Sequence, residues 1–227
     1  MLLCKKRNIE RYHMVGALVY AGIGGILGAK LLLLLVSIRQ IIELHLPLEA
    51  LLKGGYVFYG GAIGGVIGFW AYAKQFHLSA VDFLDIGAMV VPLGHAFGRV
   101  GCFFSGCCYG IPYDGFLSYT YQYSMGEDTP LGVPLLPVQL IEAFCLLCIF
   151  VAILLLYKSR PMQRGREMIA YLIMYPCLRF TLEFFRGDTV RGGFLGISTS
   201  QWISLALLLT AVITVFTNRM IRRSHSQ

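Results

Sequence analysis

Charged residues are scarce in this chain. Of its 227 residues only 14% are Asp, Glu, Lys or Arg, whereas 57% are hydrophobic; soluble domains carry about 25% charged residues. The deficit excludes an ordinary soluble domain, and the abundance of apolar residues excludes a disordered chain. The 26 glycines are far too few for a collagen-like repeat. The composition predicts a polytopic membrane protein with room for about five to seven spans of roughly 20 residues and no large extramembrane domain.

Six apolar stretches approach the length needed to cross the hydrocarbon core. They cover residues 13–36, 56–73, 83–97, 138–157, 168–185 and 194–217. None has the pattern of a cleavable signal peptide, and turn-forming residues such as Lys53-Gly54-Gly55 separate them. We therefore expect an all-α protein with about six transmembrane helices, in which residues 1–227 form one domain.

The basic residues indicate how the chain is oriented, because cytoplasmic loops are enriched in Lys and Arg. With the N-terminus in the cytoplasm, 12 of the 19 Lys and Arg residues fall in cytoplasmic segments and 5 in external segments, with Lys30 and Arg179 inside spans. We expect both termini to be cytoplasmic. Since this distribution accounts for the net charge of +7 without a basic patch, no nucleic-acid partner is expected.

The longest external segment, about residues 99–136, begins with a run of glycines and aromatic residues. Non-helical backbone is tolerated at membrane depth only where protein or a wet cavity satisfies its hydrogen bonds. We expect a re-entrant or exterior-facing head segment here. The alternative is that the glycines serve only close packing between helices.

Charged side chains mark the end of the fifth span. Arg179 and Glu183 are four residues apart and share a helical face, and Arg186 is expected to follow on the same face. Charges at membrane depth are costly and normally pair or face a cavity. One interpretation is an ion pair that only fixes the orientation of the helix. We favour a guanidinium cradle for a lipid phosphate, to which Arg99 would contribute, because the planar guanidinium binds oxyanions bidentately.

Other polar residues also fall within the apolar stretches. Gln139 and Glu142 share a face near the start of the fourth span, where the helix dipole favours an anionic Glu, although polar residues often mark only a membrane boundary. Asp85 is another costly charge. Lys30 either extends its ammonium to the interface or pairs with an acid.

The seven cysteines fall into two groups. Cys102, Cys107 and Cys108 cluster in the head segment, where three interpretations are open. A disulfide would join Cys102 to one of the other two in an oxidising setting, an adjacent Arg would make a thiol reactive, and a zinc site would need a fourth ligand such as His95. Their spacing differs from that of usual zinc ligands, so no metal is expected. The other cysteines are expected to be small buried hydrophobes: Cys4, Cys145, Cys148 and Cys177.

Five ordered sequence elements carry a resemblance to a known family. They are Gly24-Gly25 to Lys30; Phe58-Tyr59-Gly60-Gly61 to Gly64; Asp85, Pro92, Gly94, Gly98, Arg99, Gly101, Phe103, Gly106 and Gly110; Pro137, Gln139 and Glu142; and Arg179-Phe180, Glu183-Phe184-Phe185 and Arg186. Over most of its length the chain resembles the prolipoprotein diacylglyceryl transferases of bacteria.

The resemblance implies an activity and a set of site residues. A diacylglyceryl group would pass from phosphatidylglycerol to the lipobox cysteine thiol in a prolipoprotein signal peptide, within the bacterial cytoplasmic membrane and without a cofactor. Arg99 and Arg179 would surround the departing phosphate, with Glu183 holding an arginine in place. Expected catalytic residues are Arg99, Arg179, Glu183, Tyr59, Cys102 and Cys107. Expected substrate-binding residues are Arg99, Arg186, Gln139, Glu142, Gly60, Gly61 and Gly101.

The chain departs from the family pattern at the positions expected to activate the thiol. Tyr59 stands where the family has a histidine, and Cys102 where it has an asparagine. Ser105 and Cys107 replace an Asn and a carboxylate, and the family's first transmembrane helix with its tyrosine is expected to have no counterpart here. Tyrosine is a poorer base than histidine at neutral pH. The phosphate half of the site is therefore expected to be retained and the thiol half altered.

Two other functions are compatible with the same elements. The first is an enzyme on this scaffold that transfers a lipid-derived group to another acceptor, with Cys102, Cys107 or Cys108 carrying a covalent intermediate. The second is a non-catalytic lipid-binding or transport protein, although the inverted repeat common in transporters is not visible in the sequence.

Overall fold

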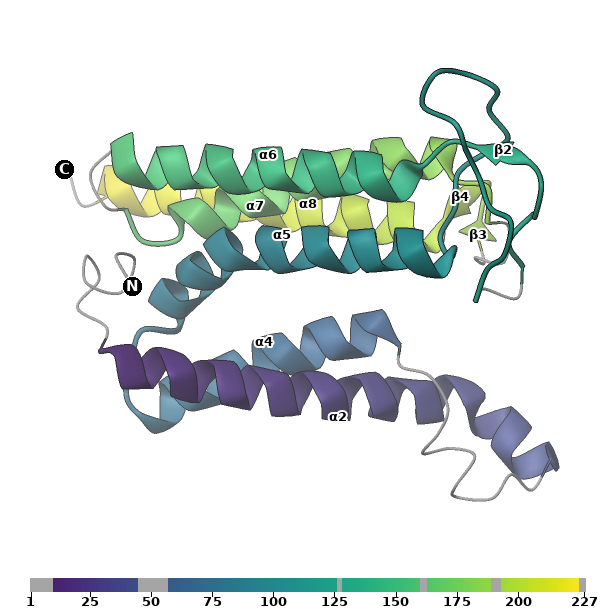
Figure 1. Ribbon diagram of the computed structural model, residues 1–227. Coiled ribbons are helices and arrows are strands. Elements are labelled where there is room, and N and C mark those ends of the chain that lie inside the picture. Colours follow the sequence, from purple (N-terminus) through teal and green to yellow (C-terminus); the bar gives the residue numbers. More distant parts are fainter. Residues whose placement is uncertain (1–9, 45–56, 126–127, 160–162, 189–192, 225–227) are drawn as a thin grey trace. The chain divides into compact units, whose positions relative to one another are not determined.

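The computed structural model describes residues 10–44, 57–125, 128–159, 163–188 and 193–224, which are mostly helical (Figure 1). The helices are α2 (Arg11–Leu44), α4 (Phe58–Gln75), α5 (Ala80–Ser105), α6 (Val138–Ser159), α7 (Arg166–Leu182) and α8 (Thr199–Ser224). Among the described residues, five helical spans are long and apolar enough to cross a membrane: α2, α5, α6, α7 with the turn that follows it to Phe185, and α8. The expected all-α, multi-pass membrane protein is confirmed.

Several helix boundaries differ from those expected, and two of them lie beside the head segment and the site. Helix α5 runs from Ala80 through the glycine-rich stretch to Ser105, because a helix satisfies its own backbone hydrogen bonds in an apolar medium. Helix α8 begins at Thr199, later than the apolar stretch suggests. The residues before it form a hairpin of β3 (Gly193–Phe194) and β4 (Ile197–Ser198), turned by Leu195 and Gly196 at positive φ.

The described residues belong to two compact units, Met1–Ile86 and Gly87–Gln227, and α5 contributes to both. In the N-terminal unit α2 and α4 pack through glycines. A Cβ atom added at Gly28 would collide with the carbonyl oxygen of Gly60 and lie 3.0 Å from the Cα of Gly64. Small residues let membrane helices approach this closely, which explains the glycine pairs in both helices.

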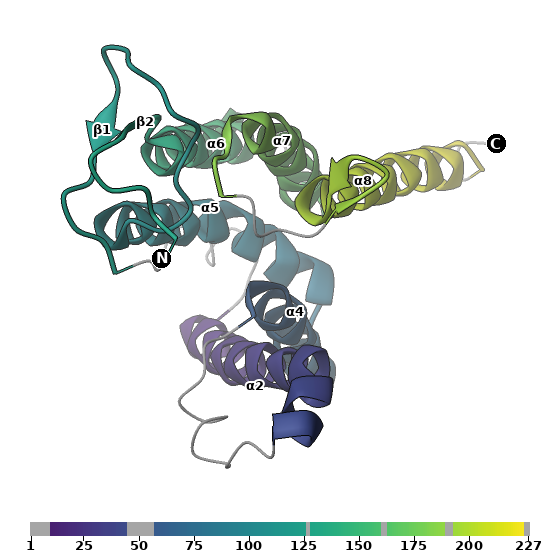
Figure 2. The ribbon, with the colours of Figure 1, turned by 90° about the vertical axis from the view of Figure 1, so that its right-hand side faces the viewer.

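In the C-terminal unit, α6 lies beside α7 and α7 beside α8 (Figure 2). Ala96 of α5 packs with Ala143 and Leu146 of α6, and α7 contributes Tyr175 and Leu178 to the same core. This packing places one face of α5 against the first turns of α6. The residues that follow α5 and precede α6 lie at this end of the unit (Figure 1).

The first residues of the expected head segment, 99–105, belong to α5. The rest of it connects α5 to α6 and carries the strands β1 (Tyr119–Thr120) and β2 (Pro134–Leu135), which pair antiparallel. An isolated bridge joins Gly110 to Arg186, which follows the 3₁₀ helix η1 (Glu183–Phe185). Backbone hydrogen bonds flank this bridge on both sides: the N–H of Ile111 donates to Phe185, and that of Gly187 donates to Tyr109, each at 3.0 Å. The head segment is thus attached to the end of α7.

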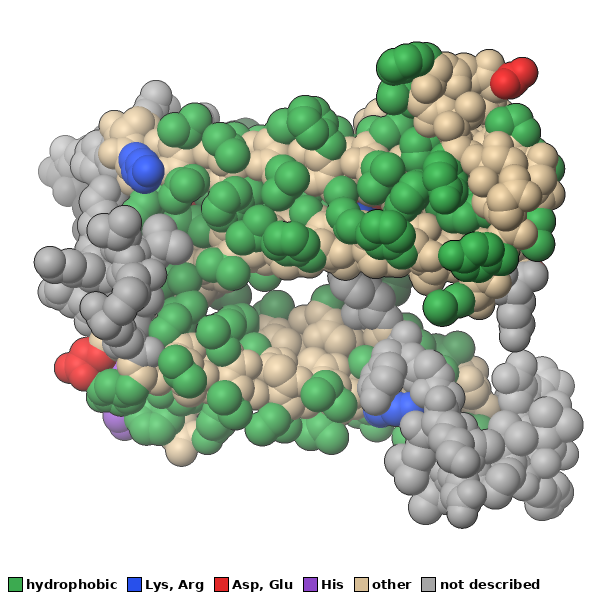
Figure 3. Space-filling view, viewed as in Figure 1, with side chains coloured by type: hydrophobic (Ala, Val, Ile, Leu, Met, Phe, Trp, Pro, Cys, Tyr) green, Lys and Arg blue, Asp and Glu red, His purple; other side chains and the backbone are tan. Residues whose placement is uncertain are grey.

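The outer surface of the helices is apolar. Hydrophobic side chains are spread over the whole visible length of the helices, and charged side chains are few (Figure 3). Exposed large hydrophobic side chains follow the helices, and examples are Leu27 and Leu31 on α2, Val151 and Leu155 on α6, and Leu209 and Phe216 on α8. Such a surface suits lipid contact.

Candidate functional site

The first charged pair of the site joins α5 to α6. Arg99 Nε lies 3.1 Å from Glu142 Oε2, and His95 Nε2 lies 3.8 Å from the other oxygen of the same carboxylate. His95 and Arg99 are four residues apart and share the α5 face that meets α6. The carbonyl of Pro137 accepts the first N–H groups of α6, which starts the helix so that Glu142 points inward with 1% of its side chain exposed.

The second pair lies on α7. Arg179 Nη1 is 2.6 Å from Glu183 Oε2, as their four-residue spacing predicts, and both side chains are almost fully buried. The Nη2 group of Arg179 donates a hydrogen bond of 2.9 Å to Ser200 Oγ at the start of α8. Arg179 thus connects two helices and has its orientation fixed from both.

The third arginine lies outside the α-helix. The expectation that Arg186 continues the face of Arg179 and Glu183 is wrong, because α7 ends at Leu182 and Arg186 has an extended backbone. Its guanidinium instead donates two parallel 2.9 Å hydrogen bonds to the Asp188 carboxylate. This bidentate geometry is the strongest arrangement for such a pair.

The guanidinium of Arg186 is nevertheless held in the charged form. Burial by itself lowers the pKa of Arg186, but the hydrogen bonds and charge of Asp188 and the neighbouring Cys108 side chain raise it more. The net pKa therefore lies above its ordinary value. Nη1 of Arg186 is buried and lacks a hydrogen-bond partner among the described residues, so one donor group is available for an anion.

The three arginines form one electrostatic group. Arg99 and Arg179 both act on His95 through their charges, and Arg186 acts on Arg99 in the same way. Each guanidinium has its own carboxylate, so the group is close to neutral until an anion enters. Since a carboxylate occupies at most part of the five donors of a guanidinium, the others can bind an oxyanion.

Gln139 connects the head segment to α6. Its Nε2 donates a 2.8 Å hydrogen bond to the carbonyl of Cys107 and lies 3.4 Å from the Tyr121 hydroxyl, which itself donates to the Phe103 carbonyl. Burial raises the pKa of Tyr121 to about 12, so its hydroxyl remains a donor. Gln139 Oε1 is buried and makes no hydrogen bond with the described residues.

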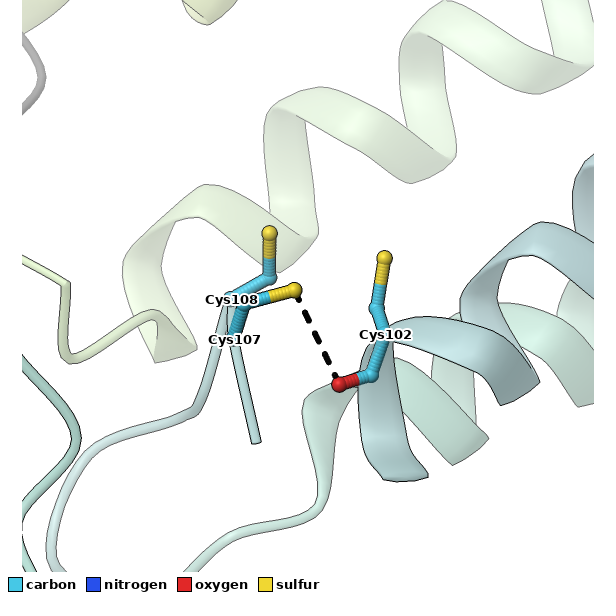
Figure 4. Close-up of side chains that lie close together, drawn as sticks. All are labelled: Cys102, Cys107 and Cys108. Carbon is cyan, nitrogen blue, oxygen red and sulfur yellow. Dashed lines mark hydrogen bonds between the residues drawn. The ribbon is translucent and has the colours of Figure 1, made fainter. Parts of the chain in front are cut away.

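Cys102, Cys107 and Cys108 lie together at the end of α5, and all three are free thiols (Figure 4). Cys102 belongs to the last turn of the helix, and the other two follow the turn at Gly106, which has a φ of 79°. The Cys107 thiol donates to the Cys102 carbonyl at 3.7 Å and lies 3.2 Å from Ser105 Oγ. The disulfide considered from the sequence is not formed.

The remaining candidates are glycines and a tyrosine. Gly101 is exposed on α5, and a Cβ atom there would meet no atom of the described chain within 4 Å. Tyr59, Gly60 and Gly61 belong to α4 in the N-terminal unit. Gly60 packs tightly on Gly28, so close helix packing explains why residue 60 is a glycine. A Cβ atom at Gly61 would lie 3.5 Å from that of Ala29, which is an ordinary contact.

The structure thus brings eight of the candidates to one end of the C-terminal unit: Arg99, Cys102, Cys107, Gln139, Glu142, Arg179, Glu183 and Arg186. Three partners of these residues are not predicted by the sequence: Tyr121, Asp188 and Ser200. Asp188 follows Arg186 by two residues, and this proximity in the sequence indicates a possible ion pair. No sequence pattern points to Tyr121 or Ser200, which come from distant parts of the chain.

Fold and site together define a multi-pass membrane protein with a buried, arginine-rich site at the end of a helical unit. A sequence model of the prolipoprotein diacylglyceryl transferases matches residues 1–217, and the chain belongs to this family.

Named relatives agree with this assignment. The chain is 37% identical to a phosphatidylglycerol–prolipoprotein diacylglyceryl transferase of Clostridium tetani over 213 residues, which cover 93% of this chain and 82% of the relative. It is 32% identical to the Streptococcus suis transferase of the same name over 216 residues, covering 94% and 79% of the two chains. A second such protein of Clostridium perfringens is 29% identical over 96% of this chain and 86% of its own length.

Proposed function

We propose that this protein transfers a diacylglyceryl group from phosphatidylglycerol to the cysteine thiol of prolipoproteins. Its family and the names of its relatives support a transferase of lipoprotein biosynthesis. The observation that carries the assignment to this site is the group of three largely buried arginines, each paired with its own carboxylate. The reaction expels glycerol phosphate, and a departing phosphate needs cations fixed in advance.

The paired carboxylates give the arginines their function in this proposal. Glu142 and Glu183 hold Arg99 and Arg179 in fixed positions, so little reorganisation is needed when charge develops on the leaving oxygen. Because each pair is close to neutral, the empty site is less costly in an apolar medium than three isolated cations. A lipid phosphate adds the negative charge that the unused guanidinium donors accept.

The thiol half of the site stays a prediction. Tyr59, Cys102 and Cys107 are proposed to take part in proton transfer from the acceptor, since a thiolate is the nucleophile and a thiol is not. Gly60, Gly61 and Gly101 are proposed to contact substrate. The single-domain organisation of residues 1–227, with a head segment over about 99–136, is likewise proposed.

The protein is a multi-pass membrane protein, and we propose the bacterial cytoplasmic membrane with both termini in the cytoplasm. The head segment and the arginine site would then lie near the external face. Both substrates present their reacting groups there: phosphatidylglycerol its headgroup, and the prolipoprotein its lipobox cysteine at the end of the signal peptide.

A lipid-transfer assay tests the proposed function. Membranes or detergent-solubilised protein would receive phosphatidylglycerol labelled in its acyl chains and a lipobox peptide, and label on the peptide would be measured. Wild type should transfer label, and Arg99→Ala should lose about 100-fold or more of the rate, as loss of one oxyanion-stabilising group does. Lys158→Ala, which removes an exposed charge in the last turn of α6, is the matched control and should leave the rate unchanged. Equal rates for Arg99→Ala and wild type would overturn the phosphate assignment.

A further inference from the structure

Three thiols lie close together in the structure, although the spacing of Cys102, Cys107 and Cys108 in the sequence is not that of a usual metal-binding motif. The sulfur atoms of Cys102, Cys107 and Cys108 all lie within 4.8 Å of one another (Figure 4). Within the described ranges this is the only group of three or more side chains able to hold a metal ion together. None of the three is fully buried. A spacing that looks irregular in sequence therefore becomes a compact set of ligands in space.

Backbone geometry creates the cluster. Gly106 reverses the chain after α5 at a φ of 79°, and a Cβ atom there would collide with Ser124. Cys108 also has a positive φ, 60°, a conformation that is strained for residues other than glycine. Strain of this kind persists where the surroundings hold it, and it turns the thiol-bearing residues toward the end of α5.

Several hydrogen bonds hold the cluster in this arrangement. Gln139 donates to the carbonyl of Cys107 at 2.8 Å. Thr129 donates to the carbonyl of Gly106 at 3.0 Å, and Ser124 donates to that of Ser105 at 3.1 Å. The loop between the ligands is thus fixed to residues from three other positions in the chain, which makes the ligand set preorganised.

The spacing of the sulfur atoms fits a soft metal ion. A zinc–sulfur bond is about 2.3 Å, so two thiolates of one tetrahedral zinc lie about 3.8 Å apart. Sulfurs within 4.8 Å of one another reach that separation by side-chain movements of about 1 Å or less. Three thiolates are also the ligand type that selects thiophilic ions over hard ones such as Mg²⁺.

The surrounding charge suits the resulting centre. Three thiolates around Zn²⁺ carry a net charge of about −1. The charges of Arg186 and of Arg99 both act on Cys108. These permanently charged guanidinium groups would compensate the negative centre, as hydrogen-bond donors beside metal ligands commonly do.

We propose that Cys102, Cys107 and Cys108 bind one Zn²⁺ ion through three thiolates, and that its fourth coordination position takes the thiol of the acceptor cysteine. The second half of this inference rests on the proposed transferase function. Three protein ligands and one open position are the arrangement of catalytic zinc sites. Cys102 stands where the family resemblance implies an asparagine, and Cys107 where it implies a carboxylate. In this proposal the metal ion takes over the role of these missing polar groups.

The step balances without a further reactant. The acceptor thiol binds the ion as a thiolate and releases its proton to water, because a coordinating thiol is deprotonated. The sulfur then forms a bond to the glyceryl carbon that carries the phosphate, and the carbon–oxygen bond breaks. Its electron pair leaves with glycerol phosphate, whose charge the arginines stabilise. The thioether product is a weaker ligand than a thiolate, which favours its release.

Metal binding is measured on the full-length protein in detergent, independently of any transfer. Reduced, metal-free wild type is titrated with Co²⁺, and thiolate-to-cobalt charge-transfer absorption is recorded before Zn²⁺ displaces the cobalt. We expect saturation at about one ion per chain. Cys102→Ser, Cys107→Ser and Cys108→Ser should each weaken binding at least tenfold, whereas Cys177→Ser, an exposed cysteine of α7 outside the cluster, should bind like wild type.

The outcomes separate the metal site from the transferase activity. Wild-type protein without charge-transfer absorption, or a disulfide between Cys102 and either neighbour in protein isolated without added oxidant, would overturn the site even if the serine variants fail to fold. Binding by wild type with no zinc-dependent change in peptide labelling would overturn only the role in accepting the thiol. If wild type binds zinc but Arg99→Ala and wild type label the peptide equally, the metal site stands and the phosphate assignment fails.

Discussion

Each arginine of the site is paired with a carboxylate, and the three carboxylates lie at different positions in the chain relative to their arginines. Glu142 reaches Arg99 from another helix, Glu183 reaches Arg179 along the same helix, and Asp188 reaches Arg186 across two residues of extended chain. Only the second pair follows from helical periodicity. Removing one partner of a buried pair leaves an uncompensated charge, which is far more costly than removing the whole pair.

The Arg99–Glu142 pair gives a direct prediction. Glu142→Gln keeps the shape of the side chain but leaves Arg99 without its counter-charge, so we expect the free energy of unfolding to fall by about 3 kcal/mol. Peptide labelling should fall at least tenfold, because the guanidinium loses its fixed position. Thermal unfolding in detergent and the transfer assay measure the two effects. Glu10→Gln, at an exposed position, is the matched control, and equal behaviour of the two variants would refute the positioning role.

At the scale of helices, the glycines of α2 and α4 set how closely the two helices pack. Gly24 and Gly28 face Gly60 and Gly64, and added Cβ atoms would meet backbone of the other helix. Side chains cannot move aside from such a contact, since the obstacle is main chain. The helices would have to separate.

Alanine substitution tests this packing. Gly28→Ala should lower the free energy of unfolding by about 1–3 kcal/mol, the usual cost of overpacking. Gly22→Ala lies on the same helix, where a Cβ atom meets nothing within 4 Å, and should be neutral or slightly stabilising because alanine favours helix. The comparison uses unfolding midpoints in one detergent. A loss of stability at Gly22 equal to that at Gly28 would count against the close contact.

The elements show what the sequence could and could not predict. The helices could be predicted because hydropathy is a local property, and Arg179 and Glu183 could be paired because four residues make one helical turn. Hydropathy does not define the end of α7, so the sequence predicts Arg186 on a helical face, whereas the helix ends at Leu182. Its attachment to the head segment depends on a bridge to Gly110, far away in the chain. The contact between Arg179 and Ser200 could not be predicted either, because the two residues lie on different helices.

At the scale of the whole molecule, both the small number of charged residues and the apolar exterior are what a protein surrounded by lipid requires. Exposed hydrophobic side chains follow the helices, whereas the buried charges of the C-terminal unit are held in ion pairs, most of them at the arginine site and one, Glu167 with Arg166, at the start of α7. The distribution of Lys and Arg in the sequence predicts which side of the membrane each connection faces. That orientation also decides from which side the arginine site receives its substrates.

Reporter fusions test the orientation. Alkaline phosphatase inserted at Phe116, a fully exposed residue of the head segment, should be active because this enzyme folds outside the cytoplasm. The same reporter inserted at Ser159, at the other end of α6, should be inactive, whereas a fluorescent protein at Ser159 should fluoresce. The reverse pattern at the two sites would show that the chain is inserted with the opposite polarity.

The bridge between Gly110 and Arg186 has a consequence for hydrogen exchange. The amides of Ile111 and Gly187 belong to short loop segments, yet each donates to the other segment across the bridge. Neither can open without breaking the contact that holds the backbone of Arg186. Both amides should therefore exchange slowly and at matched rates, as members of one cooperative unit with the third arginine.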